Sequence, residues 1–430
     1  MCTLPSGVSF IIMLTMSNKQ FTVLQKIKTI KMKKIFIIIL LLPVAIALKA
    51  QIAIKAEVIH TVSGAVIRNG VVLVKNGKIE KIGTGLAIPA GYKIYETKVL
   101  TPGFVDPRSL VGISGALNIP TDQDQLEKSG PIQPELRAID AYNPEETLVK
   151  VIRDYGVTTI HTGHGVGALV SGQTMIAKTK EGTVETVTIQ PLSMLAMTIG
   201  PSVSGNFTSP GTKAKQMAMI RTELLKAQAY LKKQSDKDSS KRPVADLKLD
   251  MLAKLLKGEI KALITANSSL DIMSAIRLAK EFNFKLVLNG AAEAYRLIPE
   301  IKTANAEIIL HATMARNGGD MVNMTMESAA ILTKADIAVS IETGYEGYVP
   351  KTRILLFEAA QAMAFGLSFD EALKAITLNP AKLLGIADKV GSIEIGKDAD
   401  LVLFNGDPFE YLSKVCGVMI DGVMVKEGCQ

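Results

Sequence analysis

The fold is decided by residues 261–288, KALITANSSLDIMSAIRLAKEFNFKLVL, in which two apolar runs flank a longer segment with a helical pattern. The runs Lys261–Ala266 and Lys285–Leu288 have the length and apolar composition of buried strands. Ser269–Phe282 between them has the length of a helix. The stretch therefore predicts a strand, a helix and a second strand of a parallel sheet.

The same alternation continues along the chain in both directions. Four more strands are predicted, at Leu100–Val105, Gly156–His161, Glu307–His311 and Asp336–Ile341. Four more helices are predicted, at Pro144–Tyr155, Ala291–Thr303, Met326–Thr333 and Arg353–Phe365. Residues 234–248 are expected to be a polar exposed connection, and Gly163–Gly172 a tight loop. Over about 280 residues the natural closed form of this α/β alternation is a (β/α)8 TIM-like barrel.

Both ends of the globular sequence are rich in strand patterns instead. The first end contains three short runs, Ile52–His60, Val71–Lys75 and Lys78–Ile82, joined through Asn-Gly turns. The other end has a run at Ala399–Phe404 and a hairpin pattern at Val415–Val425 with an Asp-Gly turn. We expect residues 51–100 and 387–430 to pair into one small β-sandwich domain, and residues 101–386 to form the barrel.

Composition excludes several classes of protein. The chain has 430 residues, of which 48% are hydrophobic, so it can bury a large core and is too apolar to be a disordered tail. It contains no tryptophan and only four histidines, which argues against stacking platforms and histidine-rich metal sites. The first 50 residues hold seven lysines and no acidic residue, which leaves 42 of the 49 basic residues against 41 acidic ones. The remainder is nearly neutral, and no nucleic-acid partner is expected.

The N-terminal segment has the pattern of an export signal. Met32-Lys33-Lys34 is followed by an apolar run from Ile35 to Leu48 and by small Ala50. This run is shorter than the ~20 residues needed to cross a bilayer, so residues 32–50 are predicted to be a cleaved signal peptide. Residues 1–31 are predicted to be an extension from an upstream start codon. The alternative is an uncleaved segment that anchors the protein to the membrane.

Export would make the mature protein periplasmic or secreted, in an oxidising compartment. Its two remaining cysteines, Cys416 and Cys429, flank the C-terminal hairpin. The sequence is compatible both with a disulfide between these cysteines and with two unpaired thiols.

Four motifs resemble those of the amidohydrolase superfamily. Thr101-Pro102-Gly103-Phe104-Val105-Asp106 is similar to its first barrel strand, and residues 72–79, VLVKNGKI, are similar to its opening hairpin. Residues 377–382, TLNPAK, and 391–402, GSIEIGKDADLV, resemble its C-terminal signature. Residues 135–140 and 156–159 resemble the imidazolonepropionase-like branch, and the likeness extends over residues 55–428.

The resemblance implies a metal-centred barrel that hydrolyses C–N bonds of cyclic amides or blocked dipeptides. In such chemistry a divalent metal lowers the pKa of bound water and polarises the carbonyl group, while an acidic side chain accepts the water proton. The metal needs three or four nitrogen or oxygen ligands at the carboxyl ends of the strands.

This sequence departs from that pattern at the ligand positions. Arg108 and Leu110 stand where the family has His-x-His, and Thr265 stands where a later histidine is expected. Arginine is always protonated, and leucine carries no donor atom. Glu342 matches the general-base position best, with Thr343 within alignment error. No metal cofactor is expected at these degenerate positions.

A displaced metal site is an alternative. His161, His164 and His311 follow predicted barrel strands and, with Glu342, could hold zinc or another divalent metal. The competing interpretation is that His161 and His164 only make backbone hydrogen bonds in their glycine-rich loop.

Arg108 suggests a third arrangement, in which its guanidinium replaces the metal charge. Because a buried carboxylate needs a cationic partner, we expect Arg108 to form a salt bridge with Glu342.

Three functions follow from these alternatives. The first is an exported pseudoenzyme or non-catalytic subunit, paired with an active amidohydrolase paralogue or with copies of itself. The second is an active hydrolase with a displaced, chelator-sensitive metal site. The third is a module that binds a small ligand in the barrel mouth without chemistry.

Overall fold

The computed structural model describes residues 51–117, 119–346 and 351–429. The predicted signal peptide and the preceding extension lie outside the described residues. Within those residues, no helix combines the length and the apolar character needed to span a membrane.

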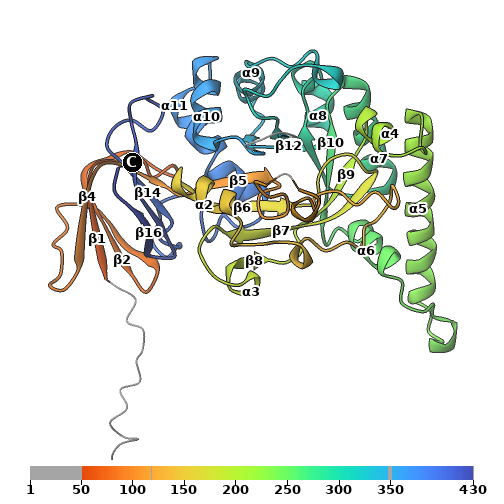
Figure 1. The fold of residues 1–430 in the computed structure, drawn as a ribbon, viewed down its shortest axis with the longest axis horizontal. Helices are drawn as coiled ribbons and strands as arrows, with labels where there is room; N and C mark the ends of the chain where they lie inside the picture. Colours follow the sequence, from red (N-terminus) through yellow and green to blue (C-terminus); the bar gives the residue numbers. More distant parts are fainter. Residues whose placement is uncertain (1–50, 118, 347–350, 430) are drawn as a thin grey trace, which may run out of the picture. The chain divides into compact units, whose positions relative to one another are not determined.

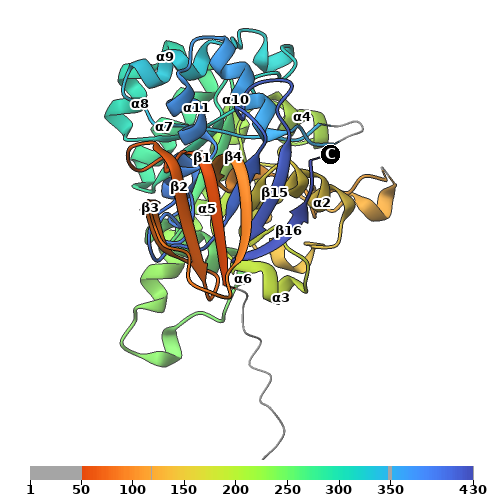
Figure 2. The ribbon, with the colours of Figure 1, turned by 90° about the vertical axis from the view of Figure 1, so that its left-hand side faces the viewer.

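Strands from both ends of the described chain form one seven-stranded sheet. In spatial order these strands are β16 (Val423–Glu427), β15 (Val415–Ile420), β14 (Leu401–Phe404), β4 (Lys93–Pro102), β1 (Ile52–Ile59), β2 (Ile67–Lys75) and β3 (Lys78–Thr84). Figure 2 shows β1, β2, β4, β15 and β16 side by side, with red-orange N-terminal strands next to blue C-terminal ones. The junction is the antiparallel pairing of β14 with β4, in which Leu403 lies opposite Leu100. Cys416 and Cys429 form a disulfide at the C-terminal edge.

The second sheet is a nearly closed eight-stranded barrel. Its strands in spatial order are β5 (Phe104–Ser109), β6 (Val157–Gly163), β7 (Val170–Lys178), β9 (Met194–Thr198), β10 (Lys261–Ala266), β11 (Leu286–Gly290), β12 (Glu307–Leu310) and β13 (Val339–Ile341). The short strand β8 (Thr188–Gln190) pairs with β7 outside this path. Strand β7 runs antiparallel to both of its barrel neighbours, and the other neighbouring pairs are parallel. The predicted α/β fold class is confirmed, and the barrel contains two strands that were not predicted, β7 and β9.

Helices accompany the barrel strands, as Figure 1 shows for α7 to α11 around β10 and β12. Their bounds are α2 Thr147–Asp154, α3 Val184–Val187, α4 Pro201–Asn206, α5 Lys213–Gln234, α6 Leu247–Leu256, α7 Ser269–Phe282, α8 Ile298–Ala304, α9 Ser328–Lys334, α10 Leu355–Ala364, α11 Phe369–Ala375 and α12 Leu378–Leu383. Helix α7 shows why these segments fold locally: the Ser268 side chain caps it by accepting from the Asp271 amide, and Asn283 ends it in the left-handed conformation.

The chain passes from the small sheet into the barrel at Gly103. The single strand predicted for Leu100–Val105 is therefore wrong, because β4 ends at Pro102 and β5 begins at Phe104. A side chain at position 103 would place its Cβ 2.2 Å from the Thr158 hydroxyl oxygen, so the backbone of β5 can approach β6 only with glycine here.

Two other predicted segments differ from the structure. Gly163–Gly172 is not one loop, since Gly163 ends β6 and Val170 begins β7. The helix predicted at Ala291–Thr303 starts only at Ile298, because Ala291 has a positive φ of 51° and a short 3-10 turn intervenes.

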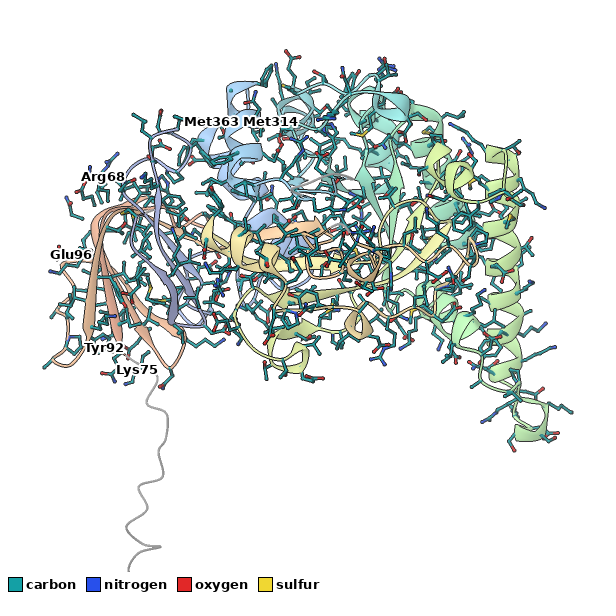
Figure 3. The ribbon with its side chains drawn as sticks, viewed as in Figure 1. Arg68, Lys75, Tyr92, Glu96, Met314 and Met363 are labelled. Carbon is teal, nitrogen blue, oxygen red and sulfur yellow. A yellow bond between two sulfur atoms is a disulfide. The ribbon has the colours of Figure 1, made fainter. Side chains whose placement is uncertain are left out.

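Polar side chains on the small sheet pair with one another. Figure 3 places Lys75 and Tyr92 near the same end of this sheet, and both contact Glu80, the Tyr92 hydroxyl at 2.7 Å and the Lys75 ammonium at 3.8 Å. These groups are satisfied locally. The buried polar atoms without a hydrogen-bond partner that are relevant to function belong to side chains of the barrel.

Candidate functional site

A cavity of about 240 Å³ lies at the carboxyl ends of the barrel strands. Its polar lining includes Arg108 from β5, Thr265 from β10, Asn289 from β11, His311 after β12 and Glu342 after β13. This is the end of the barrel where enzymes of this architecture carry their catalytic groups. The sequence analysis thus identified four of these five side chains as positions of interest, and Asn289 is the fifth.

The barrel closes beside Arg108. The Gly344 amide donates to the Arg108 carbonyl at 3.3 Å, and the Thr343 hydroxyl donates to the Asp106 carboxylate at 2.5 Å. Burial raises the pKa of Asp106 to about 7, against the lowering effect of the Thr343 and Arg108 hydrogen bonds. Thr343 therefore joins β5 to the segment after β13, and Glu342 is the carboxylate presented to the cavity.

Glu342 is held by a chain of hydrogen bonds from neighbouring strands. The Thr265 hydroxyl donates to Asn289 Oδ1 at 2.9 Å, and Asn289 Nδ2 donates to Glu342 Oε2. Burial raises the pKa of Glu342 to about 8, although Asn289 and the nearby Arg108 charge both act to lower it. Thr265 thus occupies the later histidine position as part of a fixed hydrogen-bond chain.

Arg108 is almost fully buried, with 3% of its surface exposed. Its Nη2 donates to the His164 backbone carbonyl, and its Nη1 has no hydrogen-bond partner. Burial lowers the pKa of Arg108 to about 10, so the guanidinium still carries its charge at neutral pH.

The prediction of a salt bridge between Arg108 and Glu342 is wrong. Among the ion pairs within 4 Å in the described part of the chain, none joins these two residues. The reason is that the His164 carbonyl holds one side chain and Asn289 holds the other, while both line the cavity. Each still influences the pKa of the other across it.

Leu110 adds an alkyl wall to this cavity at the second His-x-His position. Further apolar lining comes from Val166, Ala312, Ala315 and Met321. Neither position of the expected histidine pair therefore offers a metal donor.

His161 is committed to the protein core. Its Nδ1 donates to the Pro107 carbonyl at 2.6 Å, which leaves Nε2 to accept from the Thr174 hydroxyl at 2.6 Å. Burial lowers its pKa to about 3, so the ring is neutral. With both nitrogens occupied, His161 has no lone pair for a metal.

The other two candidate histidines do not complete a site. His164 is buried, its pKa is lowered to about 4 by burial, and it is not among the residues that line the cavity. His311 does line the cavity, and its Nδ1 bonds the Ala312 carbonyl at 2.8 Å while Nε2 has no partner. The described residues contain no group of three or more His, Cys, Asp or Glu side chains arranged to hold a metal ion. The displaced set His161, His164, His311 and Glu342 is therefore not assembled, and the donors present do not fit a divalent cation.

The principal group that sequence reasoning missed is Asn289, which orients Glu342. Its position at the end of a predicted strand, between Leu288 and Gly290, was the available signal. Hydrogen-bond direction could not be inferred from that position alone.

Comparisons with known proteins agree with this architecture. Residues 351–425 match the family model described as Amidohydrolase family. The crystal structure of an amidohydrolase from Thermotoga maritima superposes with a TM-score of 0.82 at 30% identity, over 87% of this chain and 100% of that one. An imidazolonepropionase from Brucella anthropi is 26% identical over 379 residues, which are 79% of this chain and 87% of that protein.

The amidohydrolase tasK of Hapsidospora irregularis is also 26% identical, over 82% of this chain. The match spans only 39% of the length of that relative.

Proposed function

This chain belongs to the amidohydrolase superfamily, in its imidazolonepropionase-like branch, and from that premise we propose that it is an exported member that does not perform metal-dependent hydrolysis. We propose further that it acts as a non-catalytic subunit. Its partner would be an active amidohydrolase paralogue or a second copy of this chain.

The observation that carries this proposal is the pair Arg108 and Leu110 at the barrel mouth. The guanidinium of Arg108 lies in the cavity wall with one nitrogen unpaired, so it places a positive charge where the family's metal would need electron donors. Leu110 contributes only carbon atoms. A cation entering this cavity would meet repulsion from Arg108, and of the four candidate ligands only His311 and Glu342 line the cavity.

The second element of the family's chemistry, a general base, is also altered. A carboxylic acid whose pKa is raised to about 8 is mostly protonated at neutral pH. In its protonated form Glu342 can donate a hydrogen bond but cannot take a proton from water.

Retention of the scaffold supports a role in assembly or binding. The C-terminal signature is built into the structure: Asp398 and Asp400 both contact the buried Lys178 of β7, at 3.2 and 2.6 Å. These residues tie the small sheet to the barrel, which keeps the fold whole in the absence of catalysis.

The disulfide between Cys416 and Cys429 supports export, since disulfides persist in oxidising compartments. Export is tested by fractionating the native cells and sequencing the N-terminus of the mature protein. We expect a chain that begins at Gln51 in the periplasm or the medium, and a cytosolic chain with an intact leader would contradict it.

The catalytic part is tested by assaying the purified chain on lactams and N-acyl amino acids after incubation with zinc or manganese. We expect no turnover. The matched control is Glu342→Gln, because hydrolysis by a contaminant would persist in that variant. Chelator-sensitive turnover that disappears in Glu342→Gln would overturn the proposal. Native mass spectrometry of the complex from its own cells would identify the partner subunit.

A further inference from the structure

Four side chains that line the barrel-mouth cavity have a buried polar atom without a hydrogen-bond partner in the protein. The atoms are Nη1 of Arg108, Nε2 of His311, Oδ1 of Asn267 and Nε of Arg353, the last of which belongs to an ion pair with Glu346. Arg108 and His311 are almost fully buried, with 3% and 2% of their surface exposed. Both residues line the cavity of about 240 Å³. Buried donors and acceptors are nearly always satisfied in folded proteins, so the unpaired atoms of Arg108, His311 and Asn267 in the lining of one cavity indicate a ligand-binding site.

The charge balance of the cavity shows which partner is missing at Arg108. No carboxylate within 4 Å pairs with this guanidinium among the residues that the structure describes. The other basic residue of the lining, Arg353, is already paired, with Glu346 at 2.5 Å. A buried, unpaired guanidinium is costly, and an anion bound beside it would offset that cost.

The directions of the hydrogen bonds at Glu342 and His311 show which of their polar atoms are already used within the protein. Asn289 donates to Oε2 of Glu342, so this hydrogen bond leaves Oε1 free of Asn289. His311 donates through Nδ1 to the Ala312 carbonyl, so its Nε2 offers a lone pair.

The rest of the cavity lining is apolar, so it favours a ligand whose uncharged part is apolar. Leu110, Val166, Ala312, Ala315 and Met321 are apolar, and they line the same cavity as Arg108. The volume corresponds to about eight water molecules at about 30 Å³ each, which limits the ligand to a small molecule.

We propose that the barrel-mouth cavity binds a small carboxylate with an apolar body, whose carboxylate pairs with Arg108 at the position that holds a metal ligand elsewhere in the family. The inference rests on the proposed function, because it takes the barrel mouth to be free of metal. The third group, His311 Nε2, would accept a hydrogen bond from a ligand that also carries a donor.

The test compares benzoate with benzamide, which has nearly the same shape but no charge. Binding to the purified chain is measured by ligand-observed NMR and calorimetry in a buffer without carboxylates. We expect benzoate to bind about tenfold more tightly or better, since a hydrogen bond between two charged groups is stronger than one that involves a neutral amide. Equal affinity for the two compounds, or no binding of benzoate, would refute the inference.

Arg108→Gln is expected to lose this preference for benzoate. The matched control is Arg137→Gln, which removes an arginine whose side chain is 56% exposed, and it should bind as the wild type does. Unchanged benzoate affinity in Arg108→Gln would also refute the inference. If that variant does not fold, the preference of the wild-type protein for benzoate over benzamide decides the question.

The same samples separate this inference from the proposed function. Release of ammonia from benzamide, or metal bound in a stoichiometric amount, would defeat the non-catalytic proposal. Failure of benzoate to bind without either observation would defeat only the carboxylate site.

Discussion

Replacing Lys178 by methionine tests how the C-terminal signature holds the small sheet on the barrel. The Lys178 ammonium contacts three carboxylates, Asp400 at 2.6 Å, Asp398 at 3.2 Å and Asp421 at 3.3 Å. Side-chain exposure is 5% at Lys178 and 2% at Asp400, so both charges are buried. Methionine keeps the length of the side chain but leaves the Asp400 charge unpaired.

Breaking a buried ion pair in this way costs about 3–5 kcal/mol, because the remaining charge stays desolvated. The matched control is Lys180→Met. Lys180 lies two residues further along, contacts Asp421 at 2.7 Å and has a side chain that is 31% exposed. An ion pair of that kind contributes about 0–1 kcal/mol.

The free energy of unfolding of both variants is measured by urea denaturation at neutral pH. The difference in the free energy of unfolding between Lys178→Met and Lys180→Met should become smaller at acidic pH. Burial raises the pKa of Asp400, so this group is among the first of the cluster to become neutral as the pH falls. A Lys178→Met protein no less stable than Lys180→Met would refute the claim that this cluster joins the two sheets.

Two further predictions concern the barrel. The folded pKa of Glu342 is about 8, above its unfolded value of 4.5, so the folded state binds more protons and stability should fall as pH rises between those values. Glu342→Gln should flatten that part of the pH–stability profile, and an unchanged slope would contradict the raised pKa. Gly103→Ala should destabilise the protein by about 1–3 kcal/mol in chemical denaturation, because the new Cβ would lie 2.2 Å from the Thr158 hydroxyl oxygen. The control Gly205→Ala, where no atom lies within 4 Å of the added carbon, should lose no stability.

The periodic part of the barrel was predictable from sequence. The strand and helix patterns at Lys261–Ala266 and Ser269–Phe282 correspond to β10 and α7 with the same bounds. Such segments carry their burial pattern in consecutive residues, so local spacing is sufficient to find them.

Features that depend on contacts between distant segments were not predictable in this way. The apolar run Leu100–Val105 looks continuous, yet it divides at Gly103 because β6 approaches there. Strand β7 was missed because glycines obscured the beginning of Val170–Lys178, whose nine residues are all buried.

The candidate site also combines features that were predictable from the sequence with features that were not. The sequence identified Arg108 and Glu342 as neighbours in the barrel mouth, and the structure places both in one cavity. Their orientations depend on the His164 carbonyl and on Asn289, which belong to other strands and loops. Proximity followed from the family's pattern, whereas the absence of a direct ion pair required the three-dimensional arrangement.

The central claim, that this barrel has lost its metal centre, is tested most directly by elemental analysis. The chain is purified without chelator, incubated with zinc, manganese and iron in turn, and desalted before metal per protein is measured. The account predicts far less than one metal ion per chain, because the groups around Arg108 and Leu110 offer no suitable donor set. Tightly bound metal near one equivalent per chain would contradict the account and would favour the alternative that the protein is an active hydrolase.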